Sequence, residues 1–151
     1  SCWKDEIMEE DSWCPDADQA RGYQIILDFW GIPATLCEDD GVVLARLREA
    51  AIAAGCEVIN TVRYKHWGAT PSGISVVIVL NESHVAAHSY ANGGVMAIDI
   101  FTCGTHAQAK ATQLADSVKN WLGCENILQR ELPRFPNNPG EHQPCEGNDA
   151  F

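Results

Sequence analysis

Hydrophobic residues recur at helical spacing in two segments of the chain. The first begins at Asp40 and lasts about fourteen residues, with Asp39 or Asp40 as its cap and Gly55 as its stop. The second runs over residues 107–122 and ends before Gly123. Apolar residues three or four positions apart share one face of a helix, so both segments are predicted to be amphipathic helices. Their apolar positions are Val43, Leu44, Leu47, Ala51 and Ala54, and then Ala111, Leu114, Ala115, Val118 and Leu122.

Short apolar segments bounded by glycine, proline or polar residues predict strands around these helices. The segments are residues 23–29, 56–64, 73–80, 95–101 and 125–132, with a further strand between the third and the fourth. The resulting order is strand, helix, four strands, helix, strand. Helices in this order can cover one face of a sheet. We therefore expect an α+β protein, a two-layer α/β sandwich with a largely antiparallel sheet and its helices on one face.

Composition separates both ends of the chain from this predicted core. Residues 1–22 are acidic, and residues 133–151 begin with a proline-rich stretch and end with acidic residues. Segments of this kind bury little apolar surface. The expected organisation is one domain over residues 23–132, between an acidic N-terminal extension (1–22) and a proline-rich acidic tail (133–151).

The formal net charge of the 151 residues is -11, and 46% of them are hydrophobic. This charge disfavours nucleic acid and anionic membranes as partners, and it favours a small cationic ligand. No apolar stretch reaches the length of a membrane span, and the first residues lack the pattern of a signal peptide. We expect a cytoplasmic protein that binds neither nucleic acid nor membrane.

The seven cysteines are odd in number and form no C-x-x-C pair. This favours reduced thiols over a disulfide framework or a zinc site. Carboxylates and imidazoles do not recur at the spacing of metal ligands, so no metal is expected.

The polar residues that could carry chemistry lie around strand ends between residues 82 and 103. Ser83 follows the apolar segment 74–80, His88 comes five positions later, and Cys103 follows the next strand. A hydroxyl, an imidazole and a thiol could therefore converge. The alternative is an exposed turn, a surface histidine and a buried structural thiol, and composition alone does not choose between the two.

The literal motifs resemble those of the prokaryotic S-adenosylmethionine decarboxylase family, whose members cleave themselves and carry a pyruvoyl group. The resemblance rests on Glu82-Ser83-His84, on His88, on residues 98–104 (IDIFTCG) and on residues 73–75 (GIS), and it extends over about residues 23–132. It implies cleavage between Glu82 and Ser83, with a pyruvoyl group made from Ser83 and no pyridoxal phosphate or other free cofactor.

The resemblance also assigns roles to the matching residues. His88 would remove the α-proton of Ser83 during processing, and the Ser75 hydroxyl would stabilise the processing intermediate. The ketone made from Ser83 would form a Schiff base with the substrate amine and accept the electrons released with carbon dioxide. Cys103 would then return a proton, for which a thiol that is mostly protonated at neutral pH is suited.

Residues expected to contact the substrate depart from the family pattern. Tyr90 and Asn92 stand where the family has a tryptophan and a glutamate, and Trp67 lies in an altered loop over residues 66–73. Tyr90 and Trp67 could stack on adenine, and Asn92 could hydrogen-bond the ribose.

Three functions remain open on this basis. The first is decarboxylation of S-adenosylmethionine for spermidine synthesis, by a homodimer of processed chains whose active sites lie near the interface. The second is the same chemistry on arginine or ornithine, which an acidic chain would also attract. The third is an unprocessed partner subunit without catalytic activity.

Overall fold

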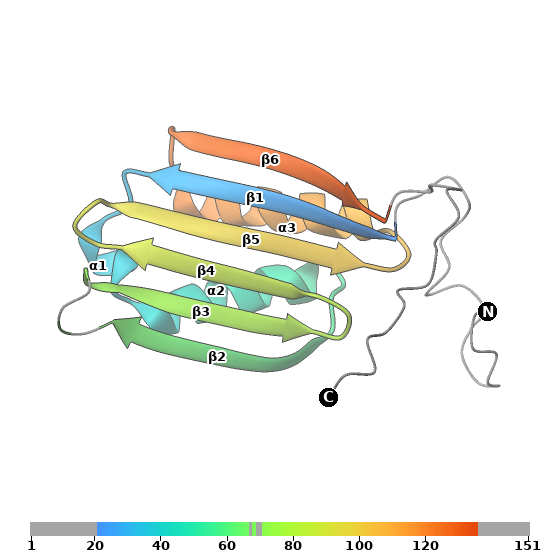
Figure 1. Cartoon of the computed structure of the whole chain (residues 1–151), viewed down its shortest axis with the longest axis horizontal. Coiled ribbons are helices and arrows are strands. Elements are labelled where there is room, and N and C mark those ends of the chain that lie inside the picture. Colours follow the sequence, from blue (N-terminus) through green and yellow to red (C-terminus); the bar gives the residue numbers. More distant parts are fainter. Residues whose placement is uncertain (1–20, 67, 69–70, 136–151) are drawn as a thin grey trace, which may run out of the picture.

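The computed structural model describes residues 21–66, 68 and 71–135. Six strands and three helices follow one another along the chain. They are β1 (Gly22–Trp30), α1 (Ala34–Cys37), α2 (Asp40–Ala53), β2 (Val58–His66), β3 (Gly73–Leu80), β4 (His84–Tyr90), β5 (Val95–Cys103), α3 (Ala107–Leu122) and β6 (Ile127–Arg134). The strands form one sheet, and all three helices lie behind it (Figure 1). This is the predicted two-layer α+β sandwich.

The sheet has the strand order β2-β3-β4-β5-β1-β6. Every neighbouring pair in it is antiparallel. Strands β2 to β5 form a meander of consecutive neighbours, whereas β1, the first strand of the chain, lies between β5 and β6 (Figure 1). Strands from the two ends of the chain are thus interleaved in the sheet.

The helix layer and the sheet enclose the hydrophobic core. Residues of β1, β3, β4 and β5 alternate between buried and partly exposed, because successive side chains of a strand point to opposite faces. The buried set meets the buried faces of α2 and α3, whose apolar spacing predicted this packing. Its largest fully buried members are Phe29, Ile25, Leu27, Leu47, Ile74, Ile78, Met96, Ile98, Ile100, Leu114, Val43 and Val76.

Both predicted helices are confirmed at their predicted positions. The Asp39 side chain accepts a hydrogen bond from the Val42 backbone N–H at 3.0 Å and caps α2. Gly123, at φ +61°, ends α3 in the left-handed conformation that favours glycine. The short helix α1 was not predicted, because four residues are too few for a periodic signal. Strands β2 and β6 each lie two residues further along the chain than predicted.

The face of the sheet opposite the helices, here called the open face, carries no layer of described residues (Figure 1). Several of its side chains are apolar and exposed, among them Val62 and Tyr64 at 58% each and Leu132 at 48%. Such a surface is typical of an interaction site.

Strands β3 and β4 approach closely at Gly73. A Cβ at this position would lie 1.9 Å from the carbonyl oxygen of Ser89, so only glycine fits. Ser89 is itself fully buried. Its hydroxyl donates to the Cys37 carbonyl and accepts from the Ile74 N–H at 3.1 Å, and so joins α1 to both strands.

Candidate active site

The Glu82–Ser83 bond lies at the tip of the hairpin that joins β3 and β4. The Leu80 N–H donates to the Ser83 carbonyl at 2.9 Å and closes the turn, and the Asn81 N–H donates to the Glu57 carbonyl at 3.0 Å. Glu82 is exposed and Ser83 is half-buried. A short turn held at both ends fixes the peptide bond at which the sequence predicts cleavage.

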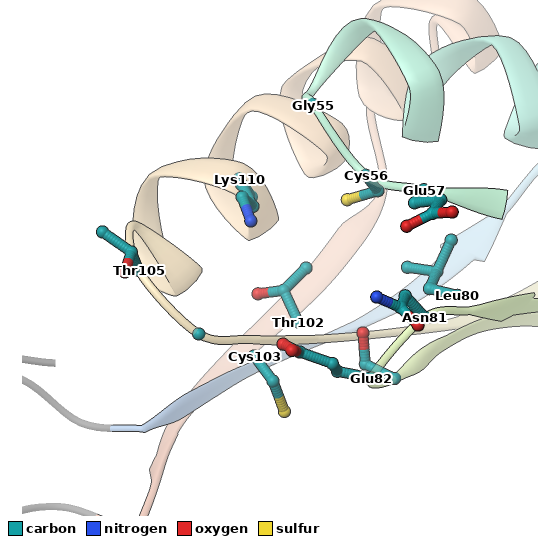
Figure 2. Close-up of a pocket in the computed structure, with 12 residues that line it drawn as sticks. Gly55, Cys56, Glu57, Leu80, Asn81, Glu82, Thr102, Cys103, Thr105 and Lys110 are labelled. Carbon is teal, nitrogen blue, oxygen red and sulfur yellow. The ribbon is translucent and has the colours of Figure 1, made fainter. Parts of the chain in front are cut away.

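A cavity of about 220 Å³ opens beside this hairpin. The α2–β2 connection, the β3–β4 turn, the end of β5 and the start of α3 contribute its walls (Figure 2). Ser83, Glu82 and Cys103 all line it. In Figure 2 the Cys103 sulfur points away from Thr102 and Lys110. Successive residues of a strand face opposite sides of the sheet, so Cys103, next to the buried Thr102, directs its thiol to the open face although it borders the cavity near Ser83.

Thr102 fixes the end of β5 next to Cys103. Its side chain is buried, and its hydroxyl donates to the Ala107 carbonyl at 2.6 Å in the first turn of α3. Cys103 is half-buried. Burial, followed by the negative charge of Glu82, raises the pKa of the Cys103 thiol, while Arg134 and Lys110 oppose the rise. The thiol is therefore held in the protonated form that a proton donor requires.

Lys110 reaches from α3 into the cavity wall (Figure 2). Its side chain is half-buried, and the ion pairs found among the described residues do not include it. Burial raises the pKa of both Cys56 and Cys103, and the positive charge of Lys110 opposes this rise. The sequence gives no signal for a role of Lys110, because a lysine on an amphipathic helix is ordinarily a solvated surface residue.

A second polar cluster lies on the open face, away from the hairpin. The Ser75 hydroxyl is 2.9 Å from Nδ1 of His88 and 3.0 Å from Nε2 of His66. Ser75 and His88 are paired across β3 and β4, and His66 ends β2. The predicted pair of processing residues thus lies together, with His66 as a third member that sequence reasoning missed.

Within one chain, the structure does not bring Ser83 and His88 together. His88 is four positions beyond His84, which follows Ser83 directly. At about 3.3 Å per residue, this places His88 about 13 Å along the strand from the hairpin end. Proton transfer requires heavy atoms about 3 Å apart. In one chain, the residue that is cleaved and the residues predicted to process it therefore lie at two separate positions on the sheet.

The residues predicted to contact the substrate lie on the side of the second cluster. Tyr90 ends β4 and is 45% exposed, and Asn92 is exposed in the turn that leads to β5. Trp67 lies outside the described residues. Neither Tyr90 nor Asn92 lines the cavity beside Ser83.

Among residues 21–66, 68 and 71–135, no group of three or more histidine, cysteine, aspartate or glutamate side chains could hold a metal ion. In the same part of the chain, no helix has the length and apolar character needed to cross a membrane.

Comparison with known proteins matches residues 23–135 to the family model described as S-adenosylmethionine decarboxylase. The matched residues include the β3–β4 hairpin, Cys103 and the cluster of His66, Ser75 and His88. The chain belongs to the S-adenosylmethionine decarboxylase family.

Relatives within this family come from bacteria and archaea. The chain is 36% identical over 113 residues to S-adenosylmethionine decarboxylase proenzyme 2 of Bacillus cereus, covering 75% of this chain and 88% of the relative. It is 34% identical over 120 residues to the S-adenosylmethionine decarboxylase proenzyme of Methanococcus maripaludis, covering 80% and 94%. The crystal structure of adenosylmethionine decarboxylase from Aquifex aeolicus has the same fold, with a TM-score of 0.71 at 22% identity over 83% of this chain and 99% of that chain.

Proposed function

We propose that this chain is a proenzyme that cleaves itself between Glu82 and Ser83 and then decarboxylates S-adenosylmethionine. The observation that carries the proposal is that Ser83, at a fixed hairpin tip, lies near Cys103 at the end of β5, whose raised thiol pKa keeps its proton available. Family membership supplies the substrate, and a net charge of -11 suits a cationic one.

In processing, the Ser83 hydroxyl oxygen attacks the carbonyl carbon of Glu82. The C–N bond breaks, and the amide becomes an ester with a free Ser83 amine. A base then removes the α-proton of Ser83, the Cβ–O bond breaks, and Glu82 leaves as a carboxylate. Water displaces ammonia from the dehydroalanine that remains, which leaves a ketone at the new amino terminus. A fixed turn lowers the entropy cost of the first attack.

Ser83 fits this role because it is half-buried at the edge of a cavity that Cys103 also borders. The ketone made from it supplies an electron sink for decarboxylation. Cys103 holds a proton at the end of β5, and the half-buried Lys110 supplies a positive charge to a cavity that Glu57 and Glu82 also line.

We further propose that the base, His88, comes from a second copy of the chain. Ser75 and His88 are on the open face, where apolar side chains are exposed, and they are about 13 Å from the hairpin of their own chain. A two-fold axis through two stacked open faces exchanges the clusters, so that the partner's His88 approaches Ser83 and the reverse holds at the other site. The proposed homodimer covers the exposed apolar residues and completes two sites at once.

The test is the intact mass of the full-length protein under denaturing conditions, with and without borohydride. We expect two fragments that divide between Glu82 and Ser83, the second carrying a reducible ketone, and we expect Ser83→Ala to remain uncut. Carbon dioxide release from S-adenosylmethionine, arginine and ornithine then identifies the substrate. Release from arginine or ornithine alone would replace S-adenosylmethionine, and a single uncut chain with an ordinary serine would refute the self-cleaving function.

A further inference from the structure

His66, Ser75 and His88 form a continuous hydrogen-bonded row on the open face. Nε2 of His66 is 3.0 Å from the Ser75 hydroxyl, which is 2.9 Å from Nδ1 of His88. Both distances are within the ordinary range for N and O atoms. His66 and Ser75 are half-buried, whereas His88 is exposed. The row therefore begins in the edge strand β2 and ends at the side chain that faces outward.

The Ser75 hydroxyl has only one proton to donate. When it donates to one of the two imidazoles, it can accept a hydrogen bond only from the other. The row therefore has two possible directions. In one, Ser75 donates to His88, so that Nδ1 of His88 carries no proton and Nε2 does. In the other, Nδ1–H of His88 donates to Ser75, and Ser75 donates to Nε2 of His66.

The direction decides whether His88 can act as a base. Nδ1 of His88 is occupied by Ser75, so Nε2 is the ring nitrogen left to meet another group. Nε2 can accept a proton only when Nδ1 carries the hydrogen, which is the second direction. In that direction Ser75 needs an acceptor on its other side, and Nε2 of His66 is at the required distance.

We propose that His66 is a positioning residue, which accepts the Ser75 hydroxyl proton and thereby holds His88 in the tautomer whose Nε2 can take the Ser83 α-proton. The proposal rests on the proposed self-cleavage for the identity of that proton, but the tautomer of His88 depends only on the row itself.

Neighbouring groups hold His66 at this end of the row. The Tyr64 ring meets the His66 ring edge-on, with the centroids 5.6 Å apart. His66 is paired with Gly73 across β2 and β3, two positions before Ser75 on the same face. The imidazole is thus fixed both by a ring contact and by strand register.

The direct test is the tautomer of His88, read by ¹⁵N NMR of the imidazole nitrogens in alkaline buffer. The Ser83→Ala chain is used throughout, because it stays uncut whatever the other substitution does. We expect a pyrrole-type Nδ1 and a pyridine-type Nε2 for His88. Adding His66→Leu should exchange the two signals, and His66→Gln, whose amide oxygen can accept from Ser75, should restore them. His106→Asn, at an exposed histidine outside the row, is the matched control.

The second test is the rate of self-cleavage in chains that keep Ser83. His66→Leu should slow cleavage by about 10- to 100-fold, a part of the roughly 10²- to 10⁴-fold that general base catalysis contributes. His66→Gln and His106→Asn should cleave near the wild-type rate. If His66 had only a structural role, His66→Leu and His66→Gln would change the cleavage rate alike, and the His88 tautomer would be the same in both.

The outcomes separate this proposal from the function on which it rests. If the wild-type chain does not cleave but His88 exchanges tautomer on His66→Leu, the self-cleavage is refuted and the positioning role stands. If the wild-type chain cleaves and His88 carries its proton on Nε2, or is unchanged in His66→Leu, the positioning role is overturned.

Discussion

Ser83 and His88 should complement each other between chains. The perturbation is a pair of single variants, Ser83→Ala and His88→Ala, prepared with different affinity tags and refolded together in equal amounts. Each variant alone should remain uncut, because every site in its own dimer lacks one of the two groups. In a mixed dimer, one site joins the intact Ser83 of one chain to the intact His88 of the other, and the second site has neither.

The expected magnitude follows from the two-fold arrangement. Random pairing of equal amounts makes about half of the dimers mixed, so about half of the chains that retain Ser83 should be cleaved. This is about a quarter of all chains in the mixture. If Ser83 and His88 acted within one chain, the yield would be zero. The separation of about 13 Å along β4 is the reason for expecting the first result.

The assay is intact mass spectrometry of the whole mixture, which gives the yield, and of mixed dimers isolated through both tags, in which every chain that retains Ser83 should be cleaved. Co-expressing wild type with the double variant Ser83→Ala/His88→Ala gives the opposite test, because wild type prepared alone would already have cleaved in its own dimers. The wild-type chain should stay uncut in that mixed dimer, since the partner offers it no His88, although it contains both groups itself. Cleavage of the wild-type chain there, or none in mixed dimers of the single variants, would refute the shared site.

Three further predictions concern the fold and the thiol. Lys110→Met should raise the pKa of the Cys103 thiol further, because it removes a charge that opposes the rise. In uncleaved precursor, the midpoint of Cys103 alkylation, followed by peptide mapping, should move to higher pH in Lys110→Met but not in Lys110→Arg, and a move to lower pH would contradict the electrostatic reasoning. Leu114→Ala should lower the free energy of unfolding by about 2–5 kcal/mol in urea titrations, since Leu114 is fully buried. A loss below about 1 kcal/mol would contradict the tight packing of Leu114 in the core. Gly73→Ala should destabilise the chain by about 1–3 kcal/mol and slow self-cleavage, because the added Cβ meets a backbone carbonyl; wild-type stability and rate would speak against this close approach.

Much of the fold could be predicted from the sequence, because a helix or strand that buries one face repeats its apolar residues at the period of that element. The spacing of Leu114, Ala115 and Val118 predicted α3, and the apolar segment over residues 73–80 predicted β3, since each pattern matches one kind of backbone geometry. Helix α1 has only four residues, too few for a helical period of about 3.6 to repeat, and its position depends on tertiary contacts such as that of Ser89 with Cys37.

The candidate site was predictable only in its residue types. The motifs identified Ser83, Cys103, Ser75 and His88, but closeness in sequence suggested that Ser83 and His88 meet. Counting the strand rise from the hairpin would have revealed their separation. His66 could not have been found this way, because its contact with Ser75 depends on the register of β2 and β3, which the sequence does not show.

The position of β1 between β5 and β6 has a consequence for the cleaved protein. Cleavage at the hairpin tip assigns β1, β2 and β3 to one fragment and β4, β5 and β6 to the other. Neither fragment holds a contiguous half of the sheet, so the fragments cannot separate without breaking the pairing on both sides of β1. The precursor folds as one chain in a unimolecular reaction, whereas refolding of the processed form requires an encounter of two fragments. Self-cleavage therefore changes the molecularity of folding, and the mature protein depends on a structure that its precursor formed first.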